Sequence, residues 1–125
     1  MFQELKLKKA YRYIIYKLSD DSKTIVVEKA CEKAEYNDFV AQLPEEDCRY
    51  AVFDFEFTLS AAEGQRNKIC FFVWAPDNSK IKQKMLYASS KDALRKKLVG
   101  ISTEIQGTDF SEVSYETVLD KVKSF

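Results

Sequence analysis

A two-residue period of apolar and polar positions marks several segments of the chain. Residues 49–58 place three phenylalanines on one face of an extended chain and acidic residues on the other, which predicts a half-buried strand. Residues 69–75 are apolar at every position, so this strand must be covered on both sides, and we expect it at the centre of a sheet. Residues 11–18 and 24–28 flank a polar turn and predict a hairpin, and residues 103–105 predict a further short strand.

Shorter helices are expected between and beyond these strands. Residues 2–8 predict the end of an amphipathic helix, and residues 36–43 predict a short helix that Pro44 stops. Ser114 is a good N-cap for a last helix, whose apolar stripe would pack on the sheet. The polar residues 60–67, which include a glycine, are expected to form a loop between strands.

Residues 80–101 predict a long helix whose two faces differ in chemistry. The face that can pack on a core consists of Tyr87, Ser90, Leu94 and Leu98. The opposite face consists of Lys82, Met85, Ser89 and Lys96. A long apolar side chain on the solvent face, beside Lys82 and Lys84, is typical of a protein-binding surface. Gly100 is expected to end this helix.

The composition indicates one globular domain over residues 1–125. Hydrophobic residues make up 46% of the 125 residues and charged residues 32%, which is ordinary for a folded domain. The predicted elements give an α/β (α+β) fold with a mixed sheet and helices on both faces. Twenty basic and twenty acidic residues cancel, which argues against a general nucleic-acid binder.

Catalytic and metal chemistry find little support in the sequence. The chain has no histidine and no close cysteine pair, so the commonest general base and a zinc site are both disfavoured. Ser90 and Lys91 are neighbours that point about 100° apart on a helix, so they do not form a nucleophile pair. Three widely spaced cysteines fit small core residues in a reducing compartment. No apolar run is long enough to span a bilayer, and no signal peptide is expected.

Four long sequence blocks, taken in order, resemble the cofilin/actin-depolymerising-factor family. Residues 84–95, Lys-Met-Leu-Tyr-Ala-Ser-Ser-Lys-Asp-Ala-Leu-Arg, are similar to the long actin-binding helix of that family. Residues 47–56, 69–77 and 107–116 continue the resemblance, which therefore spans nearly the whole chain. It implies a single ADF-homology domain with a gelsolin-like fold and a central mixed sheet of five or six strands.

The resemblance also implies two sets of site residues, both for binding actin and neither for catalysis. One set would contact actin in monomers and filaments: Lys82, Lys84, Met85 and Ser89. The other would contact filaments from a separate surface: Arg66, Lys68, Asp120 and Lys121. The alternative for both sets is a solvated charged surface, which spacing alone does not refute.

By resemblance, the protein would bind ADP-actin monomers and filaments, sever filaments and speed subunit loss, with no cofactor and no metal. It would act as a monomer on the cytoplasmic actin cytoskeleton, with the nucleus as a second location. Phosphoinositide lipids are a further expected partner. Alternatives are a module similar to glia maturation factor acting on the branch-nucleating complex, a phosphoinositide-binding module, or an enzyme. Family members carry an arm before the position matching Phe2, whereas Met1 directly precedes Phe2 here; a shortened gene model, an alternative start and a real truncation all fit this sequence.

Overall fold

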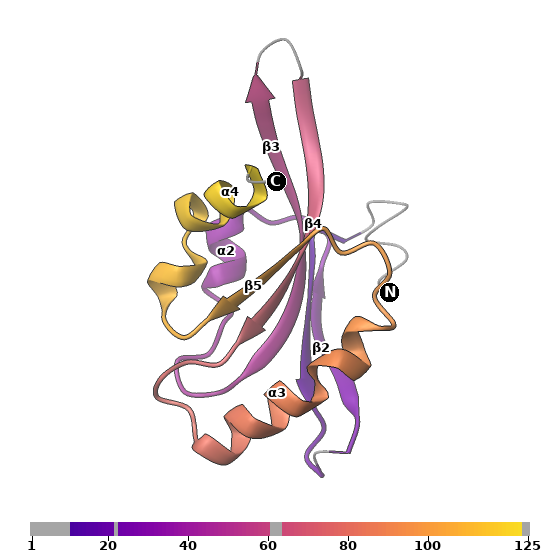
Figure 1. The fold of residues 1–125 in the computed structure, drawn as a ribbon, viewed down its shortest axis with the longest axis vertical. Coiled ribbons are helices and arrows are strands. Elements are labelled where there is room, and N and C mark those ends of the chain that lie inside the picture. The colour runs from indigo at the N-terminus through magenta and orange to yellow at the C-terminus, as the bar shows by residue number, and fades with distance from the viewer. Residues whose placement is uncertain (1–10, 22, 61–63, 124–125) are drawn as a thin grey trace.

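The computed structural model describes residues 11–21, 23–60 and 64–123, and these residues form a mixed five-stranded sheet with helices on both faces (Figure 1). The strand order is β2-β1-β3-β4-β5, in which β4 and β5 are parallel and the other neighbours are antiparallel. The bounds are β1 Tyr13–Leu18, β2 Ile25–Cys31, β3 Arg49–Ser60, β4 Gly64–Trp74 and β5 Thr103–Gly107. The predicted fold class is confirmed.

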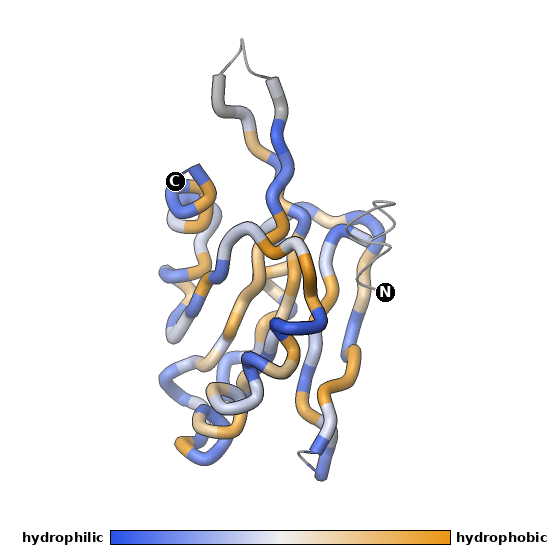
Figure 2. Tube along the Cα trace, turned by 45° about the vertical axis from the view of Figure 1, so that its right-hand side comes forward, coloured by the Kyte–Doolittle hydropathy of each residue, from blue (hydrophilic) through white to orange (hydrophobic). Residues whose placement is uncertain are grey.

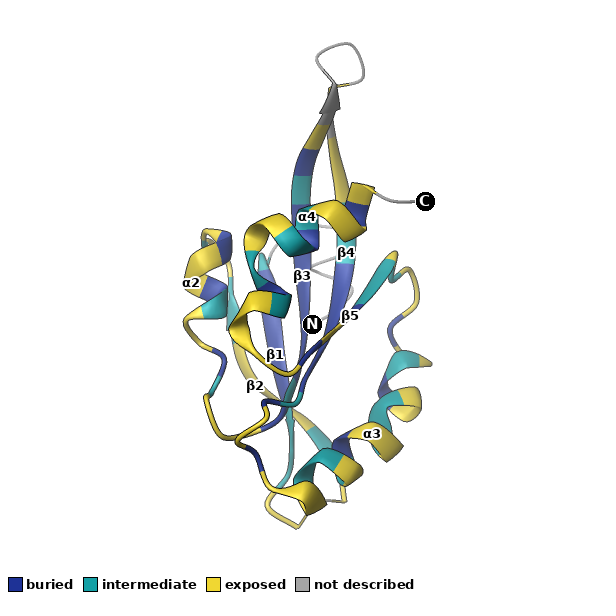
Figure 3. Cartoon of the chain, turned by 60° about the vertical axis from the view of Figure 1, so that its left-hand side comes forward, coloured by how far each residue is buried: buried dark blue, intermediate teal, exposed yellow. Residues whose placement is uncertain are grey.

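The helices divide between the two faces of the sheet. One face is covered by α2 (Tyr36–Val40), the 3-10 helix η1 (Phe110–Val113) and α4 (Tyr115–Lys123). The other face is covered, within the described residues, by α3 (Ile81–Arg95), which crosses the sheet (Figures 1 and 3). The hydropathy of the chain follows this layering, because apolar residues are concentrated in the interior of the sheet (Figure 2).

Aromatic side chains fill the core between the sheet and α2. Phe53, Phe55 and Phe57 are all buried on this face, as their alternation predicts. The ring of Tyr36 lies 5.1 Å from that of Phe53 in an edge-to-face contact. Its hydroxyl donates to the carbonyl of Val113 at 2.6 Å and so ties α2 to η1.

The inward stripe of α3 packs as its sequence predicts. Tyr87, Leu94 and Leu98 are buried against the second face of the sheet, and Ser90 is half-buried. The hydroxyl of Tyr87 accepts a hydrogen bond from the backbone N–H of Leu18 at 2.9 Å, and the hydroxyl of Tyr50 donates to the carbonyl of Tyr87. These bonds fix the rotation of α3, and with it the identity of the face that points to solvent.

Two strand predictions are wrong in detail. The apolar residues 69–74 belong to β4, which lies between β3 and β5, and the central strand is β3. An interior position is enough to explain the apolar run, because helices cover both faces there. The expected loop over 60–67 is shorter, because β4 begins at Gly64, where a φ of 74° suits the reversal. Arg66 pairs with Phe57 and Lys68 with Phe55, so the ladder extends through the polar residues.

Helix boundaries also differ from those expected. Helix α3 ends at Arg95, and the chain then turns, with the N–H of Leu98 donating to the carbonyl of Arg95 at 3.1 Å. Gly100, with a φ of 102°, completes the reversal after this turn and does not cap the helix directly. The cap at Ser114 is confirmed, since the N–H of Thr117 donates to its Oγ at 3.3 Å. The expected helix over 2–8 lies outside the described residues.

Candidate functional site

The outward face of α3 carries exposed apolar side chains next to a cation. Met85 is 67% exposed and Ile81 is 76% exposed, although both are large and apolar. Lys82 and Ser89 are exposed on the same face. We call the surface formed by Ile81, Lys82, Met85 and Ser89 the helix patch. Tyr87 and Leu94 hold this face away from the sheet, so the patch is presented by a packed, fixed element.

Lys84 lies beside the helix patch and has a second contact. It is half-buried, and its Nζ donates to the carbonyl of Asp77 at 3.1 Å, in the turn that precedes α3. The structure therefore places Lys82, Met85 and Ser89 on one outward face, with Lys84 at its flank. Sequence reasoning missed Ile81, although its position one turn before Met85 on the same face was a usable signal.

A single carboxylate anchors the second half of α3 to β5. Glu104 accepts from Lys91 Nζ at 3.0 Å and from Arg95 at 2.9 Å, two basic residues one helical turn apart. Burial opposes ionisation of Glu104, but hydrogen bonds from Lys91 and Gln106 and the charges of Lys91 and Arg95 outweigh it and lower the pKa of this carboxyl. Two cations of α3 are thus paired within the protein, and sequence analysis did not identify Glu104.

The second predicted set of residues comes together at β4 and α4. Lys68 donates from Nζ to the carbonyl of Val122 at 2.9 Å, which joins β4 to the end of α4. Arg66 is exposed two residues earlier on the same strand face, and Asp120 and Lys121 are exposed on α4. We call Arg66, Lys68, Asp120 and Lys121 the arm patch, because β3 and β4 extend beyond the body of the sheet here (Figure 1).

The two patches occupy different sides of the molecule. Helix α4 packs with the α2 face of the sheet, whereas α3 covers the opposite face (Figure 3). The predicted separation of the two residue sets therefore has a structural basis in the layers of the fold.

The buried cysteines are poor nucleophiles. All three cysteines are free thiols, and Cys48 and Cys70 are buried. Burial raises the pKa of Cys70 to about 12 and also raises the pKa of Cys48. Within the described residues, no group of three or more His, Cys, Asp or Glu side chains could hold a metal ion. Over the same part of the chain, no helix is both long enough and apolar enough to cross a membrane.

An exposed apolar and basic helix face on a packed mixed sheet is typical of a protein-binding domain. The family model for cofilin/tropomyosin-type actin-binding proteins matches residues 1–123. The cofilin of Mycosarcoma maydis is 65% identical over 121 residues, which cover 97% of this chain and 86% of that protein. The chain therefore belongs to the cofilin/actin-depolymerising-factor family of actin-binding proteins.

Solved structures agree with this assignment. The crystal structure of Streptomyces griseoflavus cofilin matches with a TM-score of 0.91 at 54% identity and covers 97% of this chain and 89% of that one. The crystal structure of Plasmodium berghei actin depolymerization factor 2 matches with a TM-score of 0.85 at 32% identity, covering 98% and 90%. The fold expected from the family resemblance is confirmed.

Proposed function

We propose that this protein binds actin monomers and filaments through the helix patch and Lys84, and that it severs and depolymerises filaments. The observation that carries the proposal is the 67% exposure of Met85 on a helix whose other face is buried. Such an activity would take place on the cytoplasmic actin cytoskeleton, and we expect the protein to act there as a monomer.

The composition of the helix patch suits a tight protein contact. Met85 and Ile81 supply apolar area at the centre, and methionine adapts its shape to a partner surface. Lys82 and Lys84 flank this area and can pair with carboxylates as water leaves the interface. A few well-packed apolar and cationic side chains carry most of the free energy in such interfaces.

Severing requires no bond chemistry in this proposal. A ligand that binds a strained filament conformation more tightly than the relaxed one shifts the population toward the strained state. The arm patch would contribute by contacting a second actin subunit, which exists in the filament and not in the monomer. Its position on another side of the domain from α3 supports contacts with two subunits at once.

A second candidate ligand, an anionic phosphoinositide lipid, is favoured by the lysines of α3 and of the turn after it that do not pair with Glu104. Lys82, Lys96 and Lys97 are exposed, and Lys82 belongs to the helix patch. Anionic headgroups would attract these cations and compete with actin, most strongly at low salt. Vesicles containing phosphatidylinositol bisphosphate should inhibit filament binding, and vesicles of neutral lipid should not. Equal filament binding with both vesicle types at low salt would refute this competition.

The actin proposal is tested by filament co-sedimentation together with severing observed by fluorescence microscopy. The double variant Lys82→Ala with Lys84→Ala should bind actin at least about tenfold more weakly, which corresponds to about 1.4 kcal/mol. Lys33→Ala is a control, because Lys33 is an exposed lysine between β2 and α2 that belongs to neither patch. Circular dichroism checks that the double variant is folded, and wild-type affinity in a folded double variant would refute the proposal.

A further inference from the structure

The zero net charge of the chain conceals an uneven distribution of charge between the two faces of the sheet. Residues 80–97, which include α3, contain seven Lys or Arg residues and one Asp. Residues 35–47, which include α2, contain five acidic residues and no basic one, and residues 107–120 contain four acidic residues and no basic one. The part of this face formed by α2 and η1 is therefore acidic, although α4 on the same face ends with Lys121 and Lys123, whereas the α3 face is basic.

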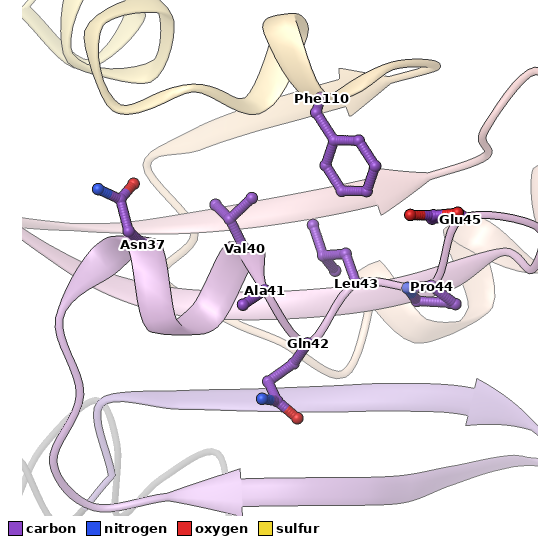
Figure 4. A pocket seen from close by; sticks show the side chains of 8 residues that line it. All are labelled: Asn37, Val40, Ala41, Gln42, Leu43, Pro44, Glu45 and Phe110. Atoms are coloured by element: carbon purple, nitrogen blue, oxygen red, sulfur yellow. The ribbon is translucent and has the colours of Figure 1, made fainter.

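An open groove with a volume of about 650 Å³ lies on the acidic face, between the end of α2, the loop that follows it and η1 (Figure 4). The side chains of Val40, Leu43 and Phe110 point into the space between these elements (Figure 4). Ala41 and Glu45 also line the groove. Phe110 is 41% exposed, so a large aromatic face is available to a ligand.

Both walls of the groove are fixed by contacts to the core. The indole N–H of Trp74 donates to the carbonyl of Pro44 at 2.6 Å, which holds the loop wall. The ring of Trp74 also packs against Phe110, with 4.9 Å between centroids, which holds the opposite wall. A site whose walls are already ordered loses little conformational entropy when a ligand binds.

We propose that this groove binds a short basic segment of another protein. One aliphatic or aromatic side chain of the segment would lie between Val40 and Phe110, and its Lys or Arg side chains would lie over Glu45. The exposed acidic residue Glu46 follows Glu45 in the same loop. Charge complementarity selects this occupant, because an acidic segment would be repelled by Glu45 and a purely apolar one would gain no attraction from it.

This inference goes beyond actin binding, since the groove and the helix patch lie on opposite faces of the sheet. A protein bound in the groove and an actin subunit bound to α3 would contact different surfaces. The groove would let the domain recruit a second protein to actin.

The test uses the full chain and a fluorescent nonapeptide built from three Lys-Leu-Phe repeats. We expect saturable binding by fluorescence anisotropy, with amide NMR shifts concentrated at Ala41, Gln42 and Phe110. Ala41→Arg fills the groove and adds positive charge at an exposed position, so it should weaken peptide binding about tenfold without unfolding the protein. Glu45→Lys should weaken binding several-fold.

The matched control is Glu32→Lys, which changes the net charge as Glu45→Lys does but lies outside the groove. It should change peptide affinity less than about twofold, and a Glu-Leu-Phe peptide should bind none of these proteins. Equal weakening by Glu32→Lys and Glu45→Lys would show diffuse charge attraction and would overturn the proposal. Loss of filament co-sedimentation in folded Ala41→Arg would assign the groove to the actin surface and would also overturn it.

Discussion

The helix patch and the arm patch are built in different ways. The helix patch comes from one helix, and its members lie within nine residues, Ile81 to Ser89. The arm patch comes from β4 and α4, which are joined by the bond from Lys68 to Val122, 54 residues apart in sequence. Local periodicity is enough to form the first patch, whereas the second exists only when the whole domain is folded.

The two patches also differ in chemistry. Met85 and Ile81 give the helix patch a large exposed apolar area, and the arm patch consists of charged residues. Apolar contacts depend weakly on ionic strength, while contacts between exposed charges are screened by salt. We therefore expect the helix patch to supply most of the affinity for actin and the arm patch to supply a smaller, salt-sensitive part that discriminates filaments from monomers.

The largest effect is expected from Met85→Glu. This change removes the apolar centre of the helix patch and adds a negative charge among lysines, so actin affinity should fall more than tenfold for both monomers and filaments. Thermal stability should change little, because the side chain is mostly exposed. Fluorescence titration of labelled monomers and filament co-sedimentation measure the two affinities, and a variant that loses affinity for filaments alone would contradict the assignment.

A smaller and more selective effect is expected from Arg66→Glu. Reversing this exposed charge should lower filament affinity about fivefold at low salt and leave monomer affinity unchanged. The difference from wild type should shrink as salt rises. Lys33→Glu serves as the control for net charge, and the same loss in both variants would show that no local filament contact is involved.

The way in which each patch is built determines how much of it can be predicted from the sequence. The helical period of Tyr87, Leu94 and Leu98 correctly identified the buried face of α3, and so the exposure of Met85. The contact between Lys68 and Val122 could not be predicted in this way, because it depends on the register of β4 and on the packing of α4.

The strand errors have the same origin. Polar residues and Gly64 predicted a loop, but pairing of Arg66 and Lys68 with buried phenylalanines of β3 extends the strand. Such pairing is a tertiary effect that outweighs local composition. Glu104 was missed for the same reason. Its role depends on ion pairs with Lys91 and Arg95 of α3, which only the folded structure brings to it.

Lys68→Gln should separate the two roles of Lys68, because this residue belongs to the arm patch and also supports the fold. Loss of its hydrogen bond to the Val122 carbonyl should lower the free energy of unfolding by about 1 kcal/mol. Arg66→Gln, at an exposed position on the same strand, should leave stability unchanged. Urea unfolding of both variants measures the difference, and equal stabilities would show that the Lys68 bond does not hold α4 in place.

The smallest effect is expected from Glu104→Gln and depends on pH. The pKa of Glu104 is lowered in the folded protein from its ordinary value of 4.5, so its stabilising contribution is complete above about pH 4.5 and is lost as pH falls through the lowered value. The variant should be less stable than wild type by about 1 kcal/mol or less at pH 7. The difference in the free energy of unfolding between the variant and wild type should disappear at acidic pH. Urea unfolding between pH 7 and acidic pH checks the prediction, and a difference that does not change with pH would refute it.

The most direct test of the two-patch account is one titration series that measures monomer and filament affinity for wild type, Lys82→Ala and Arg66→Glu under the same low-salt conditions. We expect Lys82→Ala to lower both affinities by a similar factor, whereas Arg66→Glu should lower filament affinity alone. The ratio of filament to monomer affinity should therefore fall in Arg66→Glu and stay near the wild-type value in Lys82→Ala. An unchanged ratio in Arg66→Glu would contradict the division of actin binding between the two patches.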